Sequence, residues 1–249
     1  MKAITWILLT TIVLTGCKKE KDEMASDNLK MVKSITLTGY EDQTLFVYDN
    51  KGRISQVLEN WGTIHYTYES NKVLILAKHK NKDADRYKGD ITLDAQGRFS
   101  KAAYEYFESG SKIDYTWQYN AEGHCNKVIR EVEGGLTEIF ENKFLNGDLV
   151  QTTERRDGAL YKVRKYTYYA GKPYKFSYDN RYGITTCNPG MTGQLPAMLV
   201  KDELAEDASG KIVHKASYSY EFDNDGYVTK EIISYPLQNE ILYWNYGYK

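Results

Sequence analysis

The stretch Tyr48-Asp-Asn-Lys-Gly-Arg-Ile54 has the composition of a tight turn between two β-strands. The Asp side chain can hydrogen-bond the backbone two residues further on, and the Gly adopts a positive φ without a Cβ clash. The same plan, an aromatic residue or Leu followed by Asp or Asn, two further residues and Gly, recurs at 93–97, 119–123 and 222–226, with shortened forms at 144–147 and 168–171. We therefore expect one hairpin that is repeated along the chain.

The spacing of the glycines predicts how many strands follow. From Gly97 onward, glycines stand at 97, 110, 123, 135, 147, 158 and 171, so each interval of 11 to 13 residues fits one strand plus one turn. A mostly apolar residue lies two positions after each repeat glycine, namely Ile54, Phe99, Cys125, Leu149, Pro173 and Val228. This pattern predicts about fifteen strands between Ser34 and Lys249.

Alternation within the predicted strands indicates a sheet with one buried face. Within 112–119, one face carries Ile113, Tyr115, Trp117 and Tyr119, and within 215–222 one face carries Ala216, Tyr218, Tyr220 and Phe222. The opposite faces carry charged and other polar side chains. The sequence holds 23 Tyr, a residue that is enriched in strands. Such alternation is typical of a half-buried antiparallel sheet.

We therefore predict an all-β fold, a long antiparallel up-and-down meander that is closed or nearly closed into a barrel-like shape. A small β-propeller is the alternative, because paired hairpins could also form blades. One irregular excursion, at about 180–210, interrupts the repeat and contains Pro189 and Pro196. We expect it to act as a plug over an open end or a sheet edge, with a lid over a functional site as the alternative.

The first residues have the features of an export signal. Lys2 precedes an apolar run at 4–14, which is too short to cross a bilayer comfortably. The sequence Leu14-Thr-Gly-Cys17 that follows resembles the lipobox of bacterial lipoproteins, which implies cleavage before Cys17 and lipid attachment to that residue. An ordinary secretory leader with a chance Cys is the alternative. The predicted organisation is a signal peptide at 1–16, a lipidated tether at 17–33 and one all-β repeat domain at 34–249.

The charge balance excludes one class of partner. The chain has 33 Lys and Arg against 34 Asp and Glu, and the predicted mature chain would carry a net charge of −2 because the leader holds only Lys2. Proteins that bind nucleic acid carry a basic patch or stripe, whereas the charges here alternate in sign along most segments. We expect no nucleic-acid partner.

Motifs for metal, cofactor or nucleophilic chemistry are missing from the sequence. The four histidines, His65, His79, His124 and His214, form no metal-binding spacing, and we expect each on an exposed strand or turn. Asp223-Asn-Asp-Gly226 is similar to part of a calcium loop but lacks the other ligands, so it is interpreted as a turn. Export would permit a disulfide between Cys125 and Cys187, but Cys125 occupies the apolar position after a turn glycine, which favours a buried free thiol. No catalytic residue, metal or cofactor is predicted.

The turn motifs also resemble two known families. Tyr48-Asp-Asn-Lys-Gly-Arg-Ile54 is similar to the YD repeat of Rhs-type shells, although Leu93, Asp148 and Tyr227 depart from that repeat. Leu195-Pro196 and the segment 218–230 more closely resemble a family of Bacteroidota lipoproteins of unknown function with a porin-like β fold. Lys21-Asp-Glu23 is similar to the surface-export signal of such lipoproteins, and a merely hydrophilic linker is the alternative. The resemblance implies a fold and a cell-envelope location, and it assigns no catalytic residue.

Two functional hypotheses follow. The first is a non-catalytic binding or scaffold lipoprotein, anchored in the outer membrane and reaching the cell surface, with a glycan, lipid or protein ligand. The second is an envelope hydrolase with a loop-built site near 180–210. An enzyme would show a cleft with converging polar groups and shifted pKa values beside that excursion, whereas a filled, Tyr-lined interior favours the first. A barrel that itself spans the membrane is disfavoured because the predicted apolar face is rich in Tyr.

Overall fold

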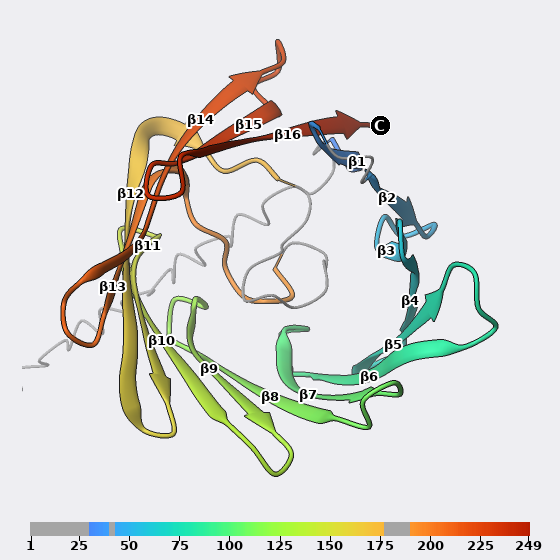
Figure 1. Ribbon diagram of the computed structural model, residues 1–249. Helices are drawn as coiled ribbons and strands as arrows, with labels where there is room; N and C mark the ends of the chain where they lie inside the picture. Colours follow the sequence, from blue (N-terminus) through green and yellow to red (C-terminus); the bar gives the residue numbers. More distant parts are fainter. Residues whose placement is uncertain (1–29, 40–42, 177–189) are drawn as a thin grey trace, which may run out of the picture.

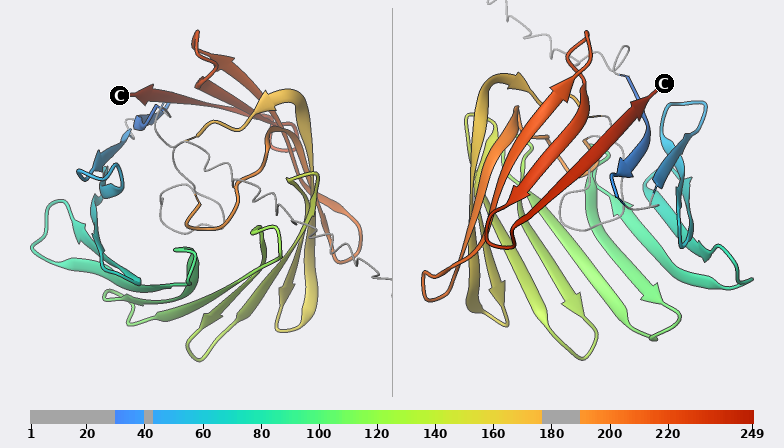
Figure 2. Two further views of the ribbon diagram at one scale, coloured as in Figure 1. Left: turned by 180° about the vertical axis from the view of Figure 1, so that it is seen from behind. Right: turned by 45° about the horizontal axis from the view of Figure 1, so that its top comes forward.

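The computed structural model describes residues 30–39, 43–176 and 190–249, which form one antiparallel sheet of sixteen strands (Figure 1). Each strand pairs with its neighbours in the sequence, and β1 pairs with β16, so the sheet closes into a barrel whose strands are inclined to its axis (Figure 2). The strands are β1 (Val32–Leu37), β2 (Gln43–Tyr48), β3 (Ile54–Glu59), β4 (Gly62–Tyr68), β5 (Lys72–His79), β6 (Asp85–Leu93), β7 (Phe99–Tyr106), β8 (Lys112–Tyr119), β9 (Cys125–Val132), β10 (Thr137–Leu145), β11 (Asp148–Arg156), β12 (Ala159–Pro173), β13 (Met198–Asp207), β14 (Ile212–Phe222), β15 (Val228–Tyr235) and β16 (Glu240–Tyr248).

This topology confirms the predicted all-β up-and-down meander and its barrel-like shape. The propeller alternative is wrong, because the strands belong to one closed sheet and are not divided into separate blades. Closure also brings the end of the chain to the start of β1, where the Lys249 N–H donates to the Met31 carbonyl oxygen at 3.0 Å.

The predicted turns form at 48–52, 93–97, 119–123, 144–147 and 222–226. The prediction of a turn at 168–171 was wrong, because β12 continues through it to Pro173 and stays paired with β13. Asp94 accepts hydrogen bonds from the backbone N–H groups of Gln96 and Arg98, both at 2.9 Å, through one carboxylate oxygen. Its second oxygen pairs with the Arg98 guanidinium at 2.7 Å, and Gly97 has a φ of +76°. The guanidinium lies over the ring of Tyr119, 4.0 Å from its centre. Arg53 lies over the ring of Tyr68 in the same way, so these two turns are each connected to the next hairpin along the barrel wall.

Tyrosine hydroxyls reinforce this connection between hairpins. Tyr68, Tyr119, Tyr168 and Tyr248 each donate a hydrogen bond of 2.7 Å to the carbonyl oxygen of an apolar residue that follows a turn. The accepting residues are Ile54, Phe99, Leu149 and Val228, four of the positions that the repeat places two residues after its glycine. The aromatic and apolar positions of the repeat thus contact each other across neighbouring hairpins.

Apolar side chains fill the inner face of one half of the barrel, β1 to β9. Inward positions are aligned by the strand register, so that Ile64 stands opposite Ala77 and Ala77 opposite Tyr87. All three are buried in one continuous core cluster. Trp117 is buried in the same cluster, and Tyr115 and Tyr119 pack against it, which confirms the predicted inner face of β8.

The segment at 190–197 folds into the interior of the barrel, inside the ring of strands in Figure 1. The Phe99 N–H donates to the Met191 carbonyl at 2.7 Å, and the Gln194 N–H donates to the Gly123 carbonyl at 3.0 Å. Thr192 is buried. This segment, the plug, is therefore attached to two hairpins on the apolar half of the barrel. The later part of the irregular interval expected at 180–210 belongs to β13, which begins at Met198.

The part of the chain that the structure describes contains no helix with the length and apolar character needed to cross a bilayer.

Candidate functional site

A cavity of about 500 Å³ lies inside the barrel, between the plug and the wall formed by β10 to β16. Tyr174, Phe176 and Pro196 contribute from the irregular segments, and the strands contribute polar and aromatic side chains from their inward positions. A barrel of sixteen strands is wide enough to enclose such a space. The chemistry of the cavity follows from which side chains the strands direct into it.

The strand register places charged residues on the inner face of β10 to β16, whereas the corresponding inward positions of β1 to β9 are apolar. Arg164 of β12 stands opposite Thr152 of β11, and Tyr166 stands opposite Glu203 of β13. On the next pair of strands, Tyr220 stands opposite Glu231. Because side chains alternate between the two faces of a strand, these residues share the inward face. Each of them lines the cavity.

Arg164 is the centre of an ion-pair network in the wall. Its Nε donates to Glu154 at 2.5 Å and its Nη1 donates to Glu203 at 2.6 Å. Glu154 and Glu203 are almost inaccessible to solvent, with exposures of 7% and 9%. Lys162 lies 3.8 Å from Glu154 and His214 lies 3.5 Å from Glu203. Carboxylates buried to this degree need such partners, since an unpaired buried charge is strongly destabilising.

Tyrosines hold the remaining carboxylate oxygens. The Tyr218 hydroxyl donates to Glu203 at 3.0 Å, and the Tyr246 hydroxyl donates to Glu231 at 2.8 Å. Burial raises the pKa of Glu231, and the hydrogen bond from Tyr246 only partly offsets that effect. Burial and the charge of Glu203 together raise the pKa of Tyr166 to about 12. The wall therefore combines two carboxylates that pair with Arg164 and one carboxyl group whose pKa burial raises.

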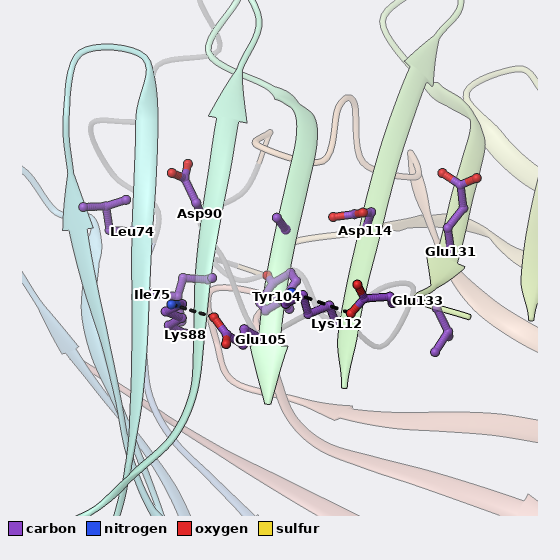
Figure 3. A pocket seen from close by; sticks show the side chains of 13 residues that line it. Leu74, Ile75, Lys88, Asp90, Tyr104, Glu105, Lys112, Asp114, Glu131 and Glu133 are labelled. Carbon is purple, nitrogen blue, oxygen red and sulfur yellow. Dashed lines mark ion pairs between the residues drawn. The ribbon is translucent and has the colours of Figure 1, made fainter. Parts of the chain in front are cut away.

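A second hollow, of about 690 Å³, lies on the outer face of β5 to β9 (Figure 3). Lys88 pairs with Glu105 at 2.6 Å, and Lys112 with Glu133 at 3.7 Å. Hydrogen bonding to Lys88 lowers the pKa of Glu105. These side chains are exposed, and exposed ion pairs contribute little to stability or binding. The described residues contain no group of three or more metal-ligating side chains. We therefore place the candidate site in the interior cavity.

The residues that the sequence singled out have different outcomes. Cys17 and Cys187 lie outside the described residues, so lipid attachment and the Cys125–Cys187 disulfide stay predictions. Cys125 is buried, as the apolar position after the turn glycine requires. Asp223 forms a turn, in which its carboxylate accepts from the N–H groups of Asp225 and Tyr227.

The prediction that the histidines are exposed was wrong, since His65, His79 and His214 are half-buried and His124 is buried. His124 was expected to be exposed in a turn, but its exposure is 5%, and its ring stacks on Phe144 with 4.4 Å between the ring centres. His214 lies 3.5 Å from Glu203 and stands opposite Ala205 of β13.

Glu154, Arg164, Glu203 and Glu231 were not identified from the sequence. A signal was present in the alternation of the strands. Glu203 is two residues from the buried Ala205, and Glu231 is two residues from the buried Ile233, so each glutamate shares the inward face.

Comparisons with known proteins agree on the fold. A porin-like protein from Bacteroides uniformis is similar with a TM-score of 0.63 and 16% sequence identity, over 89% of this chain and 98% of that chain. A porin-like protein from Bacteroides vulgatus gives a TM-score of 0.64 and 10% identity, over 88% of this chain and 99% of that chain. No protein-family model and no curated protein matches the chain significantly. The expected porin-like β fold is thus confirmed.

Proposed function

We propose that this chain is a lipoprotein of the cell envelope that binds a small polar ligand, without catalysis, in the cavity inside its barrel. The observation that carries the proposal is the cavity itself, where buried carboxylates, Arg164 and tyrosine rings meet in a barrel whose other half has an apolar core. Ligand sites commonly combine apolar and aromatic walls with a few fixed polar groups. The network around Arg164 fixes those groups before any ligand arrives.

The outer face of the barrel supports a position outside the bilayer. Cross-strand ion pairs occur on widely separated parts of the wall, between Lys72 and Asp90, Lys165 and Glu206, and Lys230 and Glu221. A lysine facing the middle of a bilayer costs about 2–4 kcal/mol, so these positions are unsuited to lipid contact. We propose that the anchor is instead the lipid on Cys17, in the outer membrane and on the cell surface.

The anchor is tested by Cys17→Ser. We expect the variant to leave the membrane fraction, because acyl chains supply the attachment and the barrel does not. Fractionation of the native host, with the wild-type chain as control, measures this. A variant that stays in membranes after carbonate washing would contradict the proposal and indicate an embedded barrel.

An envelope hydrolase is the second candidate, favoured by one observation. Glu231 has a raised pKa and Glu203 lies on the same cavity wall, which is a combination that acid–base chemistry uses. Against it, the oxygens of both carboxylates are already bonded by tyrosines or Arg164. The carboxylates also belong to strands of the sheet rather than to loops.

The binding function is tested by native mass spectrometry of the chain purified from its own host. We expect a small bound mass that is retained in mild conditions and lost on denaturation. Glu231→Gln separates the two candidates. If the chain is a hydrolase, the variant should no longer convert the bound molecule to product, whereas a binding protein releases that molecule unchanged. A chain that carries no added mass and takes up none from host extract would contradict the binding proposal.

A further inference from the structure

Four tyrosine hydroxyls of the cavity wall already donate hydrogen bonds within the protein. Tyr168 donates to the Leu149 carbonyl and Tyr220 to the Val200 carbonyl, at 2.7 and 2.9 Å. Tyr218 and Tyr246 donate to carboxylates of the wall. A phenol has one proton to give, so these hydroxyls can offer a ligand only their lone pairs. What they present to the cavity is a set of acceptors.

The ionisable side chains of the wall favour the same kind of ligand as its hydrogen-bond acceptors do. Among the described residues that line the cavity, three are carboxylic acids, Glu154, Glu203 and Glu231, and one is a cation, Arg164. The Arg164 guanidinium is shared between Glu154 and Glu203, and Lys162 also lies 3.8 Å from Glu154, so these charges are paired within the wall. An anionic ligand would therefore meet acidic oxygens without a dedicated cationic partner. A cationic ligand would meet Glu231, whose carboxyl group accepts from the Tyr246 hydroxyl, and its charge would favour the ionised form of that group.

Aromatic rings surround the same space. Phe140, Tyr166, Tyr168, Phe176, Tyr220 and Tyr246 all line the cavity. The face of an aromatic ring carries negative electrostatic potential, so a desolvated ammonium group is attracted to it by about 2 kcal/mol. Ring faces, phenolic lone pairs and carboxylates thus all favour a ligand that carries a positive charge.

We infer that the cavity takes an organic cation, a ligand whose protonated or quaternary amine lies among the aromatic rings and near Glu203 and Glu231. This inference rests on the proposed binding function and assigns the ligand class. The remaining volume, well above that of a single ammonium group, accommodates an attached hydroxylated or apolar part. Selectivity comes from charge rather than from shape, because the wall offers acceptors on several sides.

The test is calorimetric titration of the purified domain with matched probes. Choline and tetramethylammonium are the cations, 3,3-dimethylbutan-1-ol is the uncharged isostere of choline, and acetate is the anion. We expect choline to bind at least about tenfold more tightly than its isostere, which corresponds to about 1.4 kcal/mol. Binding of neither cation, or equal binding of choline and its isostere, overturns the inference.

Variants locate the effect. Glu231→Gln and Tyr220→Leu should each weaken choline binding about tenfold. Glu221→Gln is the control, because Glu221 follows Tyr220 in the chain but faces outward, and it should leave choline binding unchanged. Circular dichroism verifies that each variant is folded. An equal loss in Glu221→Gln would place the binding outside the cavity and contradict the inference. If the chain purified from its host carries a neutral or anionic molecule, the inferred ligand class is wrong, while the proposed binding function still stands.

Discussion

Glu231 is an acid whose position in the barrel favours its protonated form, because burial raises its pKa. Below about pH 4.5 both the folded and the unfolded chain hold this proton, so the group costs nothing. As the pH rises, the unfolded chain loses the proton first, and the carboxyl group destabilises the fold increasingly until the pH passes its folded pKa. Glu231→Gln removes this dependence. We expect the variant to gain free energy of unfolding relative to wild type between pH 4 and pH 8.

Chemical denaturation at the two pH values measures the effect. Glu221→Gln serves as the control, since Glu221 is exposed and paired with Lys230 on the outer face. The difference in free energy of unfolding between Glu221→Gln and wild type should change little over the same pH interval. A Glu231→Gln variant whose relative stability falls as the pH rises would mean that the ionised carboxylate is the form the fold prefers.

The plug offers a comparison between two glycines of one segment. Gly190 and Gly193 both have a positive φ, of +85° and +94°. A Cβ at Gly190 would meet nothing within 4 Å, whereas one at Gly193 would lie 2.6 Å from the Tyr119 ring and 2.7 Å from the Gly123 carbonyl oxygen. Gly190→Ala should therefore cost about 1–2 kcal/mol from backbone strain alone. Gly193→Ala should cost more, because the plug must also move away from β8.

Thermal unfolding of both variants, together with fluorescence of the buried Trp117, measures this difference. Equal stabilities would indicate that the plug is not held against the hairpin ends. A larger loss for Gly190→Ala would contradict the close approach at Gly193.

Closure of the barrel makes β1 and β16 interior members of the sheet. Ile35 and Tyr246 stand opposite each other across this junction, and both are buried. We expect their amides to exchange hydrogen as slowly as those of β8, because opening the junction would expose two sheet edges at once. Hydrogen exchange monitored by mass spectrometry provides the measurement. Rapid exchange confined to β1 and β16 would indicate an open sheet in solution.

The sequence predicted the fold well because local rules determine it. The turns at 48–54 and 93–97 follow from the hydrogen bonds of Asp and the positive φ of Gly, and the inner face of β8 follows from alternation. The site was not predicted, because Arg164, Glu203 and Glu231 occupy inward positions where a charge is normally taken as solvent-facing. The pairing of Arg164 with Glu203, 39 residues away, depends on register across two strands. No local pattern encodes such a pair.

The hydrogen bond between Lys249 and Met31 has a consequence for how the gene could be rearranged. Since both described ends of the barrel meet at one point, a short Gly-Ser linker could join residue 249 to residue 30. New termini could then be opened at the exposed Ser109–Gly110 turn, where a glycine Cβ would meet no neighbour. Such a circular permutant would keep every strand pairing while its termini moved to the hairpin between β7 and β8. A reporter fused there would sit at a different place on the molecule from one fused beside Met31.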